Sequence, residues 1–165
     1  MRRLVPLALL IIAILVVLTH TRRDRSTPTF GTARVLRVVD GDTISVRIGG
    51  RTERVRYIGI DTPESVKPGT PVQCYAERAA AANAGLVAGR EVKLVRDVEA
   101  RDKYGRLLAY VYREDGSFVN ATLVREGYAR TLTIPPNVAH ASEFARLARA
   151  ARVAGRGLWS ACAME

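Results

Sequence analysis

The chain of 165 residues has little cysteine, little histidine and few aromatic side chains: two cysteines, two histidines and 6% aromatic residues. Cys74 and Cys162 do not have the spacing of a CxxC pair and form no zinc site. Internal repeats and low-complexity tracts are absent as well. The composition, 48% hydrophobic and 25% charged, suits one compact domain with a short extra segment.

Two interpretations of the cysteines stay open. In an exported protein, Cys74 and Cys162 would pair and link the start of a helix to the end of the chain, which would stabilise the fold by about 4–5 kcal/mol in the chain-entropy model. Otherwise they are two unrelated small hydrophobic side chains. Of the histidines, His20 borders a hydrophobic run, and His140 is expected to be solvated near a helix start.

The N-terminal segment contains an uncharged run of fifteen residues, from Leu4 to Leu18, with arginines at both ends. A bilayer crossing needs about 20 residues, so the run fits a secretory signal peptide or a short signal anchor. No small-x-small cleavage pattern follows, which favours the uncleaved anchor. We therefore expect residues 1–20 to be a signal anchor or signal peptide, 21–31 a linker and 32–162 the domain. The flanking arginines do not decide the orientation, and we expect a membrane-anchored exported domain or a secreted one.

The net charge of +10 is divided unevenly along the chain. Residues 1–29 contribute +4 and the remaining residues +6. A basic domain of this size is a reasonable partner for polyanions. Many solvated surfaces are basic too, so charge alone identifies no partner.

Alternating hydrophobicity predicts three successive strands at residues 33–39, 43–48 and 53–60, with tight turns at 40–42 and 49–51. An alanine-rich helix follows at 75–87, then strands at 91–98 and 107–112 and helices at 119–126 and 141–154. This order predicts a mainly β, α+β fold: a five-stranded, partly open OB-type barrel with about three helices, preceded by one N-terminal hydrophobic helix.

Carboxylates occur where the hairpin of the second and third predicted strands begins and where it ends. Asp42 stands where the second strand begins and Asp61 where the third strand ends, so antiparallel pairing brings them close together. Two converging carboxylates repel unless a cation lies between them, and oxygen ligands select calcium or magnesium over zinc. Taken alone, Asp-Gly-Asp at 40–42 is most often only a turn.

Two arginines are candidates for binding a phosphate, because a planar guanidinium holds two phosphate oxygens at once. Arg106 follows Gly105 in the turn that leads into the fifth strand. Arg56 precedes Asp61 by five residues, and this odd spacing places the two side chains on opposite faces of a straight strand. A bulge or loop near Gly59 is therefore needed for them to converge. For any single arginine, a surface salt bridge is the alternative.

Several motifs together resemble the staphylococcal nuclease (thermonuclease) family. They are D-G-D-T at 40–43, R-x-x-x-x-D-T-P-E at 56–64, D-K-Y-G-R-x-L-A-Y-V-Y at 102–112, L-V-R-E-G-Y-A at 123–129 and G-L-W at 157–159. The resemblance extends over nearly the whole predicted domain. It implies an OB-fold nuclease that uses calcium, cuts DNA and RNA and leaves 3′-phosphate ends. We expect the protein to be monomeric.

The resemblance also implies a role for each residue of the site. Asp42, Asp61 and the backbone carbonyl of Thr62 would bind Ca²⁺, and Glu64 would activate the attacking water. Arg56 and Arg106 would bind the scissile phosphate and stabilise the transition state, and Lys103 and Tyr104 would contact a neighbouring phosphate. One departure is that residues 130–136 contain no aromatic side chain where the family has tyrosines beside the nucleotide, so base stacking is expected to be weaker or supplied elsewhere.

Two other functions remain as alternatives. The first is a non-catalytic OB module that binds nucleic acid or peptide, which would not need all five of Asp42, Arg56, Asp61, Glu64 and Arg106. The second is a membrane-anchored structural protein with a basic outer domain, which explains the charge and the hydrophobic run but not the carboxylates.

Overall fold

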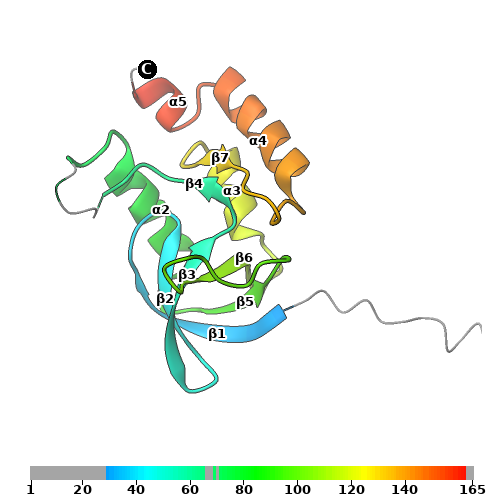
Figure 1. Cartoon of the computed structure of the whole chain (residues 1–165). Helices are drawn as coiled ribbons and strands as arrows, with labels where there is room; N and C mark the ends of the chain where they lie inside the picture. The colour runs from blue at the N-terminus through cyan, green and yellow to red at the C-terminus, as the bar shows by residue number, and fades with distance from the viewer. Residues whose placement is uncertain (1–28, 66–68, 70, 163–165) are drawn as a thin grey trace, which may run out of the picture.

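The computed structural model describes residues 29–65, 69 and 71–162 (Figure 1). The predicted N-terminal hydrophobic helix and the signal segment lie outside the described residues. Within the described part, no helix is both long and apolar enough to span a bilayer. The predicted division into domain, linker and anchor stays a prediction.

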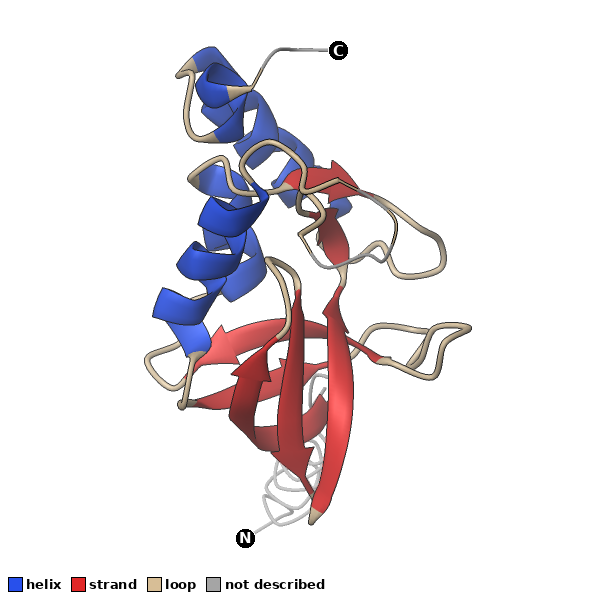
Figure 2. Ribbon diagram, turned by 90° about the vertical axis from the view of Figure 1, so that its left-hand side faces the viewer, coloured by secondary structure: helices blue, strands red, loops and turns tan. Residues whose placement is uncertain are grey.

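A closed barrel of five strands forms one end of the molecule, in the order β1-β2-β3-β6-β5 (Figures 1 and 2). Its strands are β1 (Thr29–Val38), β2 (Thr43–Ile48), β3 (Arg51–Tyr57), β5 (Glu91–Val95) and β6 (Leu107–Arg113). The mainly β, α+β fold class and the five-stranded barrel are confirmed. The barrel is closed rather than partly open because β3 pairs with β6 in parallel and β1 pairs with β5.

Alternation within the strands produces the core. Val35 of β1, Val46 of β2 and Val55 of β3 are buried, whereas their neighbours Arg34, Arg47 and Arg54 are exposed. β1 begins at Thr29, inside the segment that we predicted to be a linker, and four residues before the predicted start of the strand. β5 ends at Val95, three residues earlier than predicted.

The third predicted strand, residues 53–60, is divided in the structure. β3 ends at Tyr57, and a separate short strand β4 (Gly59–Asp61) pairs with β7 (Arg130–Leu132), which the sequence pattern did not predict. Gly59 takes a φ of 79°, a left-handed conformation that glycine adopts without a Cβ penalty. Asn120, fully buried, donates to the Ile58 carbonyl at 2.9 Å and so holds the break. The bulge expected near Gly59 is therefore present.

The helices are α2 (Ala76–Val87), α3 (Val119–Arg125), α4 (Ala141–Val153) and the one-turn α5 (Leu158–Ala161). The first three match the predicted helices, and α5 is additional. They lie on the side of the barrel opposite the β2–β3 turn (Figure 1). α3 packs against α4 and β6, and α2 packs against α3 and β1. α3 and α4 also pack against the β4–β7 pair, which lies above the barrel in the view of Figure 1.

An aromatic cluster fills the space between β6 and α4. The Tyr110 ring lies edge-on to His140, with centroids 4.5 Å apart, and Phe118 lies 4.8 Å from His140. His140 also contacts Glu143 at 2.8 Å through Nδ1. The His140 side chain keeps 29% of its surface exposed, and its ring also packs among aromatic side chains at the start of α4.

Cys74 and Cys162 form a disulfide that spans 88 residues of sequence. It joins the segment before α2 to the end of α5, and the first of the two interpretations of the cysteines is the correct one. The described part of the chain contains no free cysteine. The bond lies beside the loop that follows β4, because Asp61, Thr62, Cys74 and Cys162 line one depression.

Candidate active site

Arg56 forms ion pairs with both Asp42 and Asp61, the two carboxylates that the sequence predicts to converge. Its Nε lies 3.1 Å from Asp42 Oδ1, and its Nη2 donates to Asp61 Oδ1 at 2.8 Å. Its Nη1 donates to the backbone carbonyls of Tyr57 and Ile60, at 2.9 and 2.8 Å. Both carbonyls face Arg56 because the strand breaks between β3 and β4. The predicted convergence of Asp42, Arg56 and Asp61 is confirmed.

The two carboxylates differ in their surroundings. Asp42, just before β2, has a side chain only 7% exposed, and its Oδ2 accepts from the Thr62 N–H and hydroxyl at 2.7 and 2.9 Å. The Asp61 side chain, at the end of β4, is 55% exposed. Asp42 therefore holds the loop after β4 against the start of β2, while Asp61 faces solvent.

A second acidic group lies next to Asp42. Burial, followed by repulsion from Asp42, raises the pKa of the Asp40 carboxyl to about 6. The Asp42 N–H donates to Asp40 Oδ1 at 3.0 Å, and the buried Asn83 side chain donates to the Asp40 carbonyl. Asn83 in turn accepts a hydrogen bond from Tyr57 at 2.9 Å. The turn at residues 40–42 is thus tied to both β3 and α2.

Arg106 is held by the loop that carries it. Its Nε donates to Asp102 Oδ2 at 2.6 Å, and Asp102 Oδ1 accepts from the backbone N–H groups of Tyr104 and Arg106. Burial opposes ionisation of Asp102, but these hydrogen bonds hold the pKa of its carboxyl below the ordinary value. Tyr104 is 72% exposed, and the charged groups of Arg106 and Lys103 lie over its ring at 5.5 and 5.1 Å.

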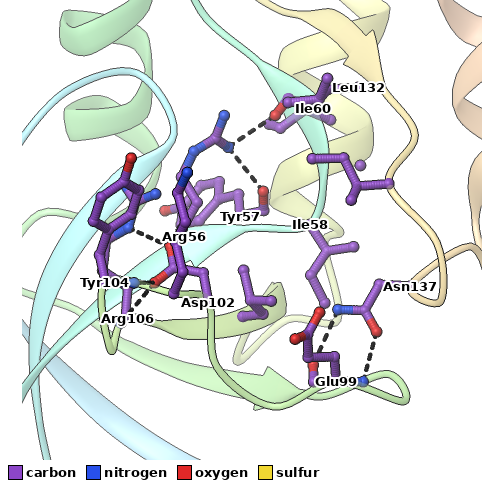
Figure 3. Close-up of a pocket in the computed structure, with 14 residues that line it drawn as sticks. Arg56, Tyr57, Ile58, Ile60, Glu99, Asp102, Tyr104, Arg106, Leu132 and Asn137 are labelled. Atoms are coloured by element: carbon purple, nitrogen blue, oxygen red, sulfur yellow. Dashed lines mark hydrogen bonds and ion pairs between the residues drawn. The ribbon is translucent and has the colours of Figure 1, made fainter.

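Arg56, Arg106, Lys103 and Tyr104 all line one cavity of about 420 Å³. Figure 3 shows this cavity, with Arg56, Tyr104 and Arg106 labelled. Its walls also include aliphatic side chains, among them Ile60, Leu132 and Ile134. Leu132 and Ile134 belong to the segment without aromatic residues, so aliphatic side chains line the cavity there. The weaker base stacking expected from the sequence stays a prediction.

Glu64 lies on the loop after β4, three residues beyond Asp61. Its backbone N–H donates to Gln73 Oε1 at 2.8 Å, and its carbonyl accepts from the Gln73 N–H at 3.0 Å. The side chain is half-buried, and Glu64 does not line the cavity of Arg56 and Arg106. The loop is therefore fixed at its backbone next to Asp61 and Thr62.

The oxygen donors gathered here suit a hard cation. Asp42, Asp61 and the Thr62 carbonyl belong to adjoining segments, and the guanidinium of Arg56 balances part of the charge of the two carboxylates. In the described ranges, no group of three or more histidine, cysteine, aspartate or glutamate side chains could hold a metal ion. A cation at this position would thus rely on two carboxylates, a backbone carbonyl and water.

Sequence reasoning missed several residues that shape the site. Arg130 of β7 pairs with Asp61 across the short sheet and lines the same depression as Thr62. Asn137 exchanges two hydrogen bonds with the backbone of Glu99, at 2.8 and 3.0 Å, and closes one side of the cavity (Figure 3). No local pattern could have identified them, because their partners lie 38 or more residues away.

Comparison with known proteins agrees with this geometry. Residues 54–161 match the family described as staphylococcal nuclease homologue. The chain belongs to the staphylococcal nuclease family. Within this family it is similar to a thermonuclease of Staphylococcus intermedius, with 50% identity over 103 residues that cover 62% of the chain and 61% of that protein.

Two further relatives extend the family comparison. A thermonuclease of Staphylococcus hyicus is 39% identical over 129 residues, covering 78% of the chain and 76% of the relative. The SPbeta prophage-derived endonuclease YokF of Bacillus subtilis is 44% identical over 126 residues, covering 75% of the chain and 42% of the relative. The matched part thus spans about three fifths of the S. intermedius relative and less than half of YokF.

Proposed function

We propose that this chain is a calcium-dependent phosphodiesterase that hydrolyses DNA and RNA and leaves 3′-phosphate ends. The observation that carries the proposal is the convergence of Arg56 with Asp42 and Asp61, beside a cavity that Arg106 shares. Similarity to proteins named thermonuclease and endonuclease supports a nuclease. A module that only binds nucleic acid would have no need for this combination.

Arg56, Arg106 and the loop that contains Lys103 would bind the substrate. Arg56 is fixed by two carboxylates and two carbonyls, and these contacts leave at least one Nη2 N–H to donate to a phosphate oxygen. Arg106, oriented by Asp102, approaches the same cavity. Such preorganised cations stabilise the negative charge that develops on phosphorus oxygens in the transition state. Lys103 and Tyr104 would bind a neighbouring phosphate.

The acidic residues supply the rest of the chemistry. Ca²⁺ held by Asp42, Asp61 and the Thr62 carbonyl would polarise a phosphoryl oxygen and offset the growing charge. Glu64 would accept a proton from the water that attacks phosphorus, as a general base does. The leaving 5′ oxygen then departs on the opposite side of the phosphate, which leaves the phosphate on the 3′ oxygen.

We also propose that the domain works outside the cytoplasm, as a membrane-anchored or secreted protein. The uncharged run at 4–18 supports an anchor or signal. The disulfide between Cys74 and Cys162 supports an oxidising compartment, because structural disulfides are rare in the cytosol.

The experiment that tests the function is cleavage of a single-stranded DNA oligonucleotide by the full chain in mild detergent. Cleavage with calcium, loss of cleavage with excess chelator and 3′-phosphate ends by mass spectrometry would support the proposal. Binding without cleavage, at every divalent cation tried, would overturn it in favour of a non-catalytic OB module.

A further inference from the structure

Four arginines gather on the outer face of the β1–β2–β3 sheet. Because opposed residues of antiparallel strands share a face, the register places Arg37 and Arg54 on either side of Ser45, and Arg34 opposite Arg47. Their neighbours Val35, Val46 and Val55 point into the core. All four arginines are exposed.

These arginines are not neutralised. Unlike Arg56, Arg101, Arg106 and Arg113, none of the four makes an ion pair or a side-chain hydrogen bond with any described residue. Glu91 lies opposite Arg34 on the side of β5 without forming an ion pair. Like charges that face each other across a sheet destabilise it. The fold therefore gains nothing from the pair Arg34 and Arg47.

The face continues into the candidate active site. Arg54 lies two residues before Arg56 on β3, so the two side chains leave the same face of the strand. Arg54 also lines a depression of about 330 Å³ with Tyr104 and Arg106, and both of these line the active-site cavity as well. A polyanion with one phosphate bound at Arg106 can therefore extend past Arg54 toward Arg37 and Arg47.

We propose that Arg37, Arg47 and Arg54 form a second binding site, which holds the sugar–phosphate backbone of a single-stranded polynucleotide several nucleotides away from the scissile bond. The inference rests on the proposed nuclease function and makes a polymer, rather than a mononucleotide, the preferred substrate. The contacts are to phosphates, so the site adds affinity without base preference.

The test compares two substrates and two variants of the full chain. The variants are Arg47→Gln with Arg54→Gln, and a control with the same loss of charge on α4, Arg146→Gln with Arg149→Gln, whose side chains are also exposed and make no ion pair with described residues. The substrates are a 20-nucleotide single strand and a nitrophenyl phosphodiester of one nucleotide. Each kcat/KM is measured over a range of salt concentrations.

For the sheet variant, we expect the ratio of kcat/KM for the 20-nucleotide strand to that for the small ester to fall at least tenfold at low salt. Loss of two phosphate contacts should also reduce the slope of log kcat/KM for the strand against log salt by about 1.4. The control should change neither. Equal ratios for the two variants would overturn the inference. Binding of both variants to anionic lipid vesicles is measured as well. If the sheet variant loses this binding while its ratio of kcat/KM values is unchanged, the arginines bind a membrane surface and the inference is overturned too. If the unmodified chain cleaves neither substrate, the proposed function itself fails.

Discussion

Asp102 orients Arg106 through a 2.6 Å hydrogen bond from Nε, and it also accepts the backbone N–H of Arg106. The guanidinium that faces the cavity is therefore positioned by a carboxylate four residues earlier in the chain. The same carboxylate fixes the turn that contains Tyr104.

Replacing Asp102 should impair catalysis without removing a catalytic group. We expect Asp102→Asn to lower kcat by about tenfold or more, because small displacements of a positioned group are costly in rate. Steady-state kinetics would separate kcat from KM, and Asp102→Glu should restore part of the loss. Glu53→Gln, which breaks the exposed pair with Arg101 beside the same loop, is the control and should leave kcat near the unmodified value. An equal effect of Glu53→Gln and Asp102→Asn would contradict the positioning role.

Replacing Glu64 tests the general base. Glu64→Gln should lower kcat by about 10²–10⁴-fold, the usual contribution of proton transfer by a positioned side chain. Its free energy of unfolding should fall by no more than about 1 kcal/mol, because glutamine keeps the size of the side chain and its capacity for hydrogen bonds. Urea titration would confirm that the variant is folded. Near-normal turnover would refute the role assigned to Glu64.

Substitution of Asp42 and of Asp61 should distinguish a loss of stability from a loss of metal binding. Asp42→Ala removes a nearly buried partner of Arg56 and Thr62, and we expect it to lower the free energy of unfolding by about 3 kcal/mol. Asp61→Ala removes an exposed partner and should cost less than about 1 kcal/mol.

Calcium should raise the Tm of the unmodified chain, because a ligand that binds only the folded state stabilises it, and a chelator should reverse the rise. Asp61→Ala should abolish most of this rise while staying folded. Differential scanning calorimetry with and without calcium measures both effects. A full calcium response in Asp61→Ala would remove Asp61 from the set of ligands.

The disulfide should contribute strongly to stability. Replacing both Cys74 and Cys162 by serine should lower the free energy of unfolding by about 2–5 kcal/mol, since the bond closes a long loop of the unfolded chain. Reductant should destabilise the unmodified protein and leave the double variant unaffected, which makes that variant its own control. Two titratable thiols in the unfolded, unreduced protein would show that the bond is absent.

Gly59 tests the break between β3 and β4. A Cβ there would lie 2.5 Å from Phe144 Cε2, and its φ of 79° penalises other residues. We expect Gly59→Ala to cost about 2–4 kcal/mol, from backbone strain and overpacking together. Gly50→Ala is the matched control: its φ is 78° but no heavy atom lies within 4 Å of the added Cβ, so only about 1 kcal/mol of strain remains. Equal losses would show that packing against Phe144 is not the cause.

The sequence predicted the barrel strands and the convergence of Asp42, Arg56 and Asp61 because these depend on local patterns. Alternation located β2, and the positions of Asp42 and Asp61 at neighbouring ends of two antiparallel strands predicted their convergence. It could not predict β7, whose three residues are all exposed and pair with β4 some 70 residues earlier in the chain. The aromatic contacts of His140 could not be predicted for the same reason, since its neighbours Tyr110 and Phe118 come from other elements.

The disulfide divides the molecule into a covalent ring, residues 74–162, and an open arm that carries β1 to β4. Lys103, Tyr104 and Arg106 belong to the ring, whereas Asp42, Arg56, Asp61 and Glu64 belong to the arm. β5 and β6 pair with each other, β1 pairs with β5 and β3 pairs with β6, so the arm must dock on both outer edges of the β5–β6 pair for the barrel to close. Phosphodiester cleavage would therefore report on the docking of the two parts, and neither part on its own contains a complete site.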